Sequence, residues 1–96
     1  MKARKTKDLK KALTKKGFEL FPEKKHHQFY FLVIEGKKQT VKTYFSHGKK
    51  EYSASLMGSI KKQLRFPDAE SAERFFDCPM SGEEYVEMLR EVGEIR

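Results

Sequence analysis

The sequence predicts one α+β domain, in which a three-stranded antiparallel sheet carries helices on one face. Apolar residues recur at helical spacing in residues 6–16 and 54–64, and three short runs rich in aromatic and β-branched residues lie between them. The runs are joined by short loops, so the strands should form a meander with both helices packed on one side. A chain of 96 residues suits a single core of this kind.

The first predicted helix spans "TKDLKKALTKK", residues 6–16, and places Leu9, Ala12 and Leu13 on one face. Thr6 is the expected N-cap, and Gly17 stands where a helix commonly ends.

The predicted strands are 18–21, which stops at Pro22, then 26–35 and 39–46, with a hairpin turn in "EGKK" at 35–38. Odd-numbered residues from His27 to Val33 share one face of the middle strand, and even-numbered residues share the other. Both faces become apolar after the first positions, so alternation leaves open which face is the core. Core packing is the expected role of Phe29 and Phe31, and base stacking on an exposed sheet face is the alternative.

A basic loop, "HGKKEY" at 47–52, leads to the second predicted helix, which Ser53 should cap. Leu56, Ile60 and Leu64 form its expected buried stripe, with Met57 beside them. Gly58 is expected to allow close packing there. This order of elements is the α-β-β-β-α layout of double-stranded-RNA-binding-like domains.

Pro67 begins an acidic section with two further predicted helices. Asp68 should cap the first, over 68–76, and "SGEEYVEMLREV" at 81–92 contains a capping box of Ser81 and Glu84. The expected division is therefore a basic α-β-β-β-α domain in 1–66 and an acidic two-helix extension in 67–96. The extension could pack into the same core, form a dimer contact, or lie across the basic face as an electrostatic lid. The residues expected to serve its packing are Phe75, Phe76, Tyr85, Met88, Leu89 and Val92.

Charge is divided unevenly along the chain. Residues 1–65 hold 18 Lys and Arg against 5 Asp and Glu, and residues 66–96 hold 3 against 9. The basic section is therefore more cationic than the net charge of +7 suggests, and such a surface attracts polyanions. We expect nucleic-acid contact rather than a merely solvated surface, because the lysines flank aromatic strands.

Cysteine and hydropathy patterns narrow the class of protein. The single cysteine, Cys78, excludes an internal disulfide and a multi-cysteine metal site. No stretch approaches the length of a membrane span, and the N-terminus lacks the apolar segment of a signal peptide. We therefore expect a cytoplasmic protein without a cofactor.

The stretch "EKKHHQFYF" brings imidazole, cations and strand together at His26 and His27. Histidine suits proton transfer because its unperturbed pKa lies near 6.5, and lysines can hold phosphate oxygens. The alternative is that both are ordinary polar residues at a strand end. Adjacent strand residues point to opposite faces, so the pair should not chelate one metal ion.

Residues 5–64 resemble the HicA toxins of bacterial and archaeal toxin–antitoxin systems. The resemblance rests on "LKKALTKKGF", on "KKHHQFYF" at the second strand, on the basic loop "SHGKK" and on the closing helix "LMGSIKKQL". It implies a metal-independent endoribonuclease that cleaves mRNA and is neutralised by a HicB antitoxin. Lys24 and Lys25 stand where the family usually has Gly-Ser, and residues 66–96 extend beyond most members.

The resemblance makes His27 the first catalytic candidate and His26 the second. Alternatives are a non-catalytic RNA-binding module and a protein-interaction domain, and a homodimer remains open. The predicted RNA-binding residues are Lys24, Lys25, Lys42, His47, Lys49 and Lys50.

Overall fold

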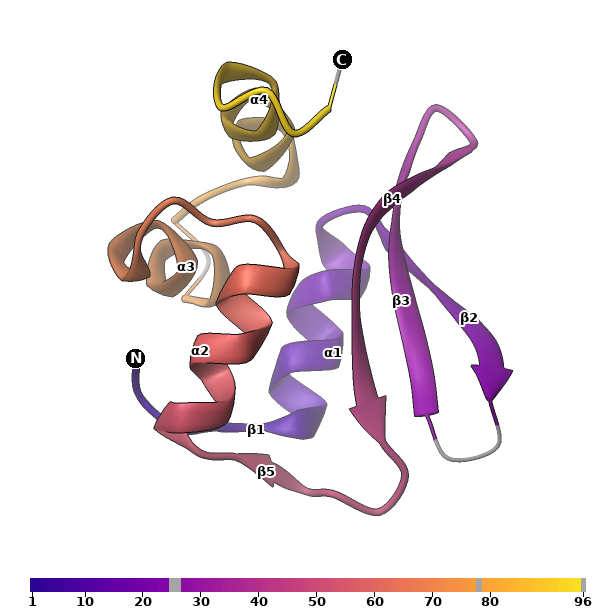
Figure 1. Ribbon diagram of the computed structural model, residues 1–96, viewed down its shortest axis with the longest axis vertical. Helices are drawn as coiled ribbons and strands as arrows, with labels where there is room; N and C mark the ends of the chain where they lie inside the picture. The colour runs from indigo at the N-terminus through magenta and orange to yellow at the C-terminus, as the bar shows by residue number, and fades with distance from the viewer. Residues whose placement is uncertain (25–26, 78, 96) are drawn as a thin grey trace.

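The computed structural model describes residues 1–24, 27–77 and 79–95, and for residues 22–24 it describes the backbone alone. The chain has an α+β fold (Figure 1) with a three-stranded antiparallel sheet in the order β2-β3-β4. The predicted class and meander are therefore confirmed. A second, two-stranded sheet, β1-β5, was not predicted. The elements in order are β1 (Arg4–Lys5), α1 (Thr6–Lys15), β2 (Phe18–Lys24), β3 (His27–Ile34), β4 (Lys37–Ser46), β5 (Glu51–Tyr52), α2 (Ala54–Gln63), α3 (Ala69–Phe76) and α4 (Gly82–Glu91).

Helices α1 and α2 cover one face of the three-stranded sheet (Figure 1). The structure settles which face of β3 is the core, because Tyr30 and Leu32 belong to the buried cluster. We call the opposite side, which carries His27, Phe29 and Phe31, the outer face. The side chains that the helices and the sheet bury against each other include Leu9, Leu13, Phe18, Val41, Phe45, Met57 and Ile60.

Phe29 and Phe31 were predicted to pack in the core, but both lie on the outer face of the sheet and outside the core cluster. Phe29 is half-buried, and Phe31, although only 7% exposed, lies outside the core cluster. Phe31 is covered on the outer face by the ring of Phe21 and by the ammonium groups of Lys38 and Lys42. Its burial comes from its neighbours on the sheet and not from the helices.

Backbone conformation explains the turn between β3 and β4 and the length of β2, which is longer than predicted. Glu35 and Gly36 have φ angles of 51° and 78°, as the two central residues of a type I′ hairpin turn require. Strand β2 continues past Pro22, where it was expected to stop, and its register shifts between Phe21 and Lys24. Because β2 is an edge strand, a residue without an N–H is tolerated there.

The two-stranded sheet β1-β5 holds the residues at which α1 begins. Lys5, not Thr6, is the N-cap, and it makes no side-chain capping bond. The hydroxyl of Thr6 instead donates to the Lys49 carbonyl at 2.6 Å, and its backbone N–H donates to the Lys50 carbonyl at 2.9 Å. These contacts fasten the β4–β5 loop to the start of α1, so the predicted cap at Thr6 is wrong by one residue.

Helix α2 is capped by Ser53 as predicted, with a hydrogen bond from the Leu56 N–H. Its buried stripe is Met57, Ile60 and Leu64, whereas Leu56 is 39% exposed. A Cβ placed on Gly58 would meet no heavy atom within 4 Å, so this glycine does not serve close packing.

The acidic extension forms α3 and α4 with the expected Asp68 cap and Ser81–Glu84 capping box. Phe75, Tyr85 and Leu89 are fully buried in the same cluster as the sheet. The rings of Phe75 and Tyr85 lie 4.9 Å apart. The extension therefore shares the core, although Val92, expected on its buried face, is 46% exposed.

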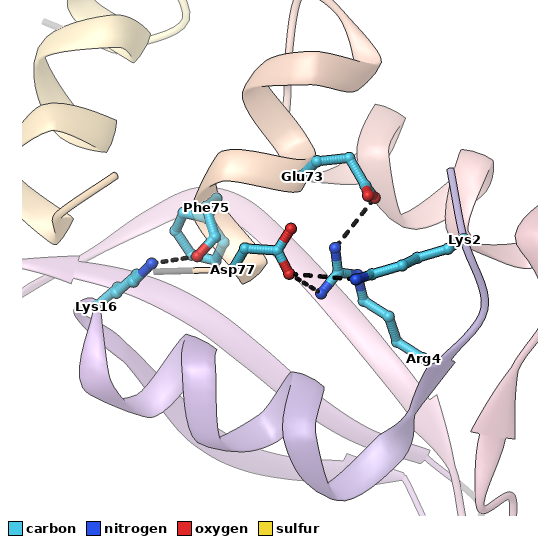
Figure 2. A network of polar contacts seen from close by, with 6 residues as sticks. All are labelled: Lys2, Arg4, Lys16, Glu73, Phe75 and Asp77. Carbon is cyan, nitrogen blue, oxygen red and sulfur yellow. Dashed lines mark hydrogen bonds and ion pairs between the residues drawn. The ribbon is translucent and has the colours of Figure 1, made fainter. Parts of the chain in front are cut away.

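Polar contacts also join the N-terminal segment to α3 (Figure 2). Arg4 contacts Asp77 at 2.9 Å and Glu73 at 3.1 Å, and Lys2 lies 3.6 Å from Asp77. The ammonium of Lys16 donates to the carbonyl of Phe75. The hydrogen bond from Arg4 lowers the pKa of the Asp77 carboxyl below its ordinary 3.8.

Candidate nucleic-acid interface

His27 stands at the first position of β3, on the outer face, and is half-buried. It lines an open hollow of about 450 Å³ between the strand ends, the β4–β5 loop and one side of α2. The lining residues from the strands and loop are His27, Tyr44, Ser46, Lys49 and Tyr52. Those from α2 are Leu56, Ser59, Ile60 and Gln63.

Strand pairing and one aromatic contact hold the imidazole. His27 is in register with Ser46 on β4, and its ring stands edge-on to Tyr44, with centroids 5.1 Å apart and planes at 90°. The backbone N–H of Ser46 donates to the hydroxyl of Tyr52 at 3.0 Å, which fixes the end of β4. The imidazole is therefore positioned by regular strand structure and remains open to solvent on one side.

Lys49 connects this hollow to a second one of about 570 Å³ at the start of α1, because it lines both. Its ammonium lies 5.3 Å from the centre of the Tyr52 ring. The second hollow is strongly cationic, with Glu51 as the carboxylate among its described lining residues. The lysines that line it are Lys5, Lys7, Lys10, Lys49 and Lys50.

A third hollow, of about 300 Å³, shares Tyr44 and Gln63 with the His27 hollow. Its cations are Lys42, Lys62 and Arg65. The described residues that line the first and third hollows include no carboxylate. The three hollows thus form a cationic path, which runs from the start of α1 past His27 to the end of α2 and can neutralise several phosphates.

The structure brings together some of the predicted site residues. Lys49 lines the His27 hollow, and Lys42 and Lys50 line its two neighbours. His47 is exposed in the β4–β5 loop and is not among the residues that line these hollows. Two other predicted residues, Lys25 and His26, lie outside the described residues. Lys24 is described by its backbone alone, which is in register with His27.

Sequence reasoning missed further cationic and aromatic residues of the path, which are Lys5, Lys7, Lys10, Tyr44, Tyr52, Lys62 and Arg65. Tyr44 carried a signal, because it shares a strand face with Lys42 and alternates with buried Val41, Thr43 and Phe45. Lys62 and Arg65 carried a weaker one, as cations at the end of a helix. Their approach to β4 depends on how α2 crosses the sheet, which local sequence does not specify.

The acidic helices α3 and α4 do not cover the His27 hollow. Among the residues that line the His27 hollow, none comes from α3 or α4, as the lid interpretation would require. Helix α4 lies instead beside the end of α1 and the β3–β4 turn (Figure 1), at the other end of β3 from His27. Cys78 lies outside the described residues.

A metal-binding group and a membrane-spanning helix are both absent from the described residues. No three His, Cys, Asp or Glu side chains among them gather as a metal-binding group would. None of the helices formed by the described residues has both the length and the apolar character that crossing a bilayer requires.

Comparisons of the chain with protein-family models, with curated proteins and with solved structures find no match. The resemblance to the HicA family therefore stays a prediction, carried by the motifs quoted above.

Proposed function

We propose that this chain is a HicA-like toxin with a double-stranded-RNA-binding-like fold, which cleaves mRNA without a metal ion. The observation that carries the proposal is the position of His27, held in an open hollow with Lys49 at the centre of a cationic path. The order of helices and strands, with α1 and α2 on one face of a three-stranded meander, supports the proposed fold.

The proposed reaction uses the ribose 2′-hydroxyl of the RNA as nucleophile. His27 accepts the proton of this hydroxyl, whose oxygen attacks the adjacent phosphorus and displaces the 5′-oxygen of the next nucleotide. The imidazolium then returns the proton to the leaving oxygen, so the products are a 2′,3′-cyclic phosphate and a free 5′-hydroxyl. Proton transfer of this kind contributes about 10²–10⁴-fold to a rate, and the ammonium of Lys49 offsets the negative charge on the phosphate.

A HicB-like antitoxin is the proposed partner, because the resemblance implies one that covers the histidine. A HicB-like reading frame beside the gene for this chain would support this part of the proposal. The proposed setting is the cytoplasm, where mRNA is the substrate.

The test compares His27→Ala with His47→Ala on a single-stranded RNA in buffer containing EDTA. His47 is a matched control, since it is exposed in a nearby loop and does not line the His27 hollow. We expect His27→Ala to lower the cleavage rate by at least about 100-fold with little loss of RNA affinity, and His47→Ala to cleave at the parental rate. Mass spectrometry should find the cyclic phosphate, and a 2′-deoxy substitution at the cleaved position should abolish its formation. Equal cleavage by the parent protein and His27→Ala would refute the proposal.

The second candidate function is a non-catalytic RNA-binding module of the same fold. It is favoured by the presence of a single imidazole among the described residues of the hollow, where many ribonucleases use two groups for acid and base. RNA binding by the parent protein without any cleavage would support this candidate. Absence of salt-dependent RNA binding would support a protein-interaction domain instead.

A further inference from the structure

We propose that the outer face of the three-stranded sheet binds single-stranded RNA by stacking its bases on a row of aromatic rings beside His27. This inference rests on the proposed function, because it names the substrate class of the same site. It adds a role for residues that the proposed chemistry does not use.

The rings form a continuous row from His27 across three strands. Tyr44 on β4 lies 5.1 Å from His27 and 5.4 Å from Phe29 between ring centroids. Phe29 and Phe31 lie 6.4 Å apart with their planes 25° from parallel, and Phe21 on β2 stands edge-on to Phe31 at 5.4 Å. Phe31 is covered by its neighbours and supports the row from beneath, whereas Tyr44, Phe29 and Phe21 are partly exposed. Every base has a π-face, so these exposed rings can receive bases whatever their sequence.

Cations accompany the rings. The ammonium of Lys42 lies 5.5 Å from the centre of Phe29 and 5.3 Å from that of Phe31, and that of Lys38 lies 4.0 Å from Phe31. Rings with lysines alongside are the combination found in proteins that bind single strands. Among the residues whose side chains are described, this part of the sheet has one carboxylate, that of Glu19, which pairs with Phe31.

The face is open where the row meets the catalytic candidate. Tyr44 is 41% exposed, and Phe21, Phe29 and His27 are half-buried. The helices α1 and α2 pack on the other side of the sheet, and no member of the row belongs to the core cluster. Tyr44 also lines the His27 hollow and the third hollow, so an RNA strand stacked here would pass the imidazole.

Single-stranded RNA suits this face better than the other occupants. A duplex hides its base faces within its own stack, so flat rings would gain no contact with them. A docking surface for a protein would carry aromatic rings, but lysine is depleted in such interfaces. The observations therefore favour unpaired bases.

The test uses Tyr44→Phe and Tyr44→Leu, two variants that differ in having or lacking a ring at an exposed position. The probe is a 2′-O-methyl RNA of eight nucleotides, which cannot form the cyclic phosphate, with one 2-aminopurine whose fluorescence falls on stacking. The parent protein should bind it more tightly than a duplex of the same sequence and should quench it. Tyr44→Phe should retain this behaviour, whereas Tyr44→Leu should bind about 5- to 150-fold more weakly, from a stacking free energy of about 1–3 kcal/mol per base. Circular dichroism should show the same fold for all three.

Several results would overturn the inference. Equal affinity and equal quenching for Tyr44→Leu and the parent protein would do so, as would preference for the duplex. A protein occupant would be indicated if sedimentation found a dimer that Tyr44→Leu dissociates while RNA affinity stays unchanged. The proposed nuclease fails separately: a parent protein that quenches the probe but leaves unmodified RNA intact retains the stacking surface without the catalysis.

Discussion

The guanidinium of Arg4 donates a 2.9 Å hydrogen bond to the carboxylate of Asp77, joining residues 73 positions apart (Figure 2). The same guanidinium lies 3.1 Å from Glu73 and 5.4 Å from the centre of the Phe76 ring. The Arg4 side chain is only 10% exposed. This contact ties the unpredicted strand β1 to the acidic extension and adds a polar attachment to the extension's apolar core.

Asp77→Asn should destabilise the protein by at most about 1 kcal/mol, because the carboxylate is 44% exposed and its ion pair is screened by solvent. The hydrogen bond from Arg4 lowers the pKa of Asp77 in the folded state, so the unfolded chain takes up its proton first as pH falls. The contribution is therefore complete above about pH 5 and is lost as pH falls below 3.8, through the lowered pKa. Urea unfolding of both proteins at several pH values measures this. A difference that grows as pH falls would contradict it.

Arg4→Ala should cost more, about 1–3 kcal/mol, because it leaves the buried Glu73 oxygen without its cation. The comparison with Asp77→Asn at pH 7 is its control. If the two substitutions destabilised the protein equally, the stabilisation would come from the Arg4–Asp77 pair and not from the Arg4–Glu73 pair.

Two helical glycines should respond oppositely to alanine. Gly58→Ala should stabilise by about 0.5–1 kcal/mol, because the new methyl group meets open space and alanine is the better helix former. At Gly82 a Cβ would stand 3.0 Å from the carbonyl oxygen and 3.2 Å from the Cα of Lys16. Because both are backbone atoms, Gly82→Ala should destabilise by about 1–3 kcal/mol. Thermal unfolding measures both, and the same sign for the two would refute the packing of α4 on Lys16.

Tyr85→Phe should destabilise by about 1–3 kcal/mol, because the buried hydroxyl donates a 2.6 Å hydrogen bond to the Leu64 carbonyl. Burial also raises the pKa of Tyr85 well above its ordinary 10. The folded state therefore keeps the phenol protonated while the unfolded chain releases it, so stability present below pH 10 is lost as pH rises further. The parent protein should lose stability above pH 10 more steeply than Tyr85→Phe, as unfolding by urea would show. Parallel pH profiles would contradict the burial of the hydroxyl.

Lys49→Ala should weaken RNA binding for all sequences and reduce the slope of log affinity against log salt by about 0.7, the contribution of one phosphate contact on a single strand. Lys11→Ala is the matched control, because Lys11 is exposed on α1 and lines none of the three hollows. Fluorescence anisotropy at several salt concentrations measures both slopes. A slope changed equally by the two variants would mean that the cationic path is not the binding surface.

Local patterns were enough to predict much of this fold. The caps at Ser53, Asp68 and Ser81 were readable because each is a side chain bonded to a backbone N–H three residues on. The hairpin turn was readable from its glycine, but it is two residues shorter than the predicted 35–38, because Lys37 and Lys38 already belong to β4. The β1–β5 pairing was not, because two-residue strands 46 positions apart have no periodicity of their own.

The candidate site was predictable only in part for the same reason. His27, Lys42 and Lys49 were selected from charge and resemblance, and each lies on the cationic path. Lys62 and Arg65 were missed because they reach it through the packing of α2 beside β4, a relationship between distant segments. The face of β3 that became the core was undetermined, since both of its faces are apolar and only the helices distinguish them.

The separation of α4 from His27 has an electrical consequence. Its carboxylates, including Glu83, Glu84 and Glu87, lie at one end of β3, and His27 and Lys49 lie around the other, while Arg65 of the cationic path pairs with Glu94 just beyond α4 at 3.3 Å. A molecule charged in this way has a permanent dipole moment and turns in the field of a polyanion before contact. The acidic end would then trail the approaching protein, and the negative charge of α4 would hasten productive encounters by suppressing those made with the wrong end first.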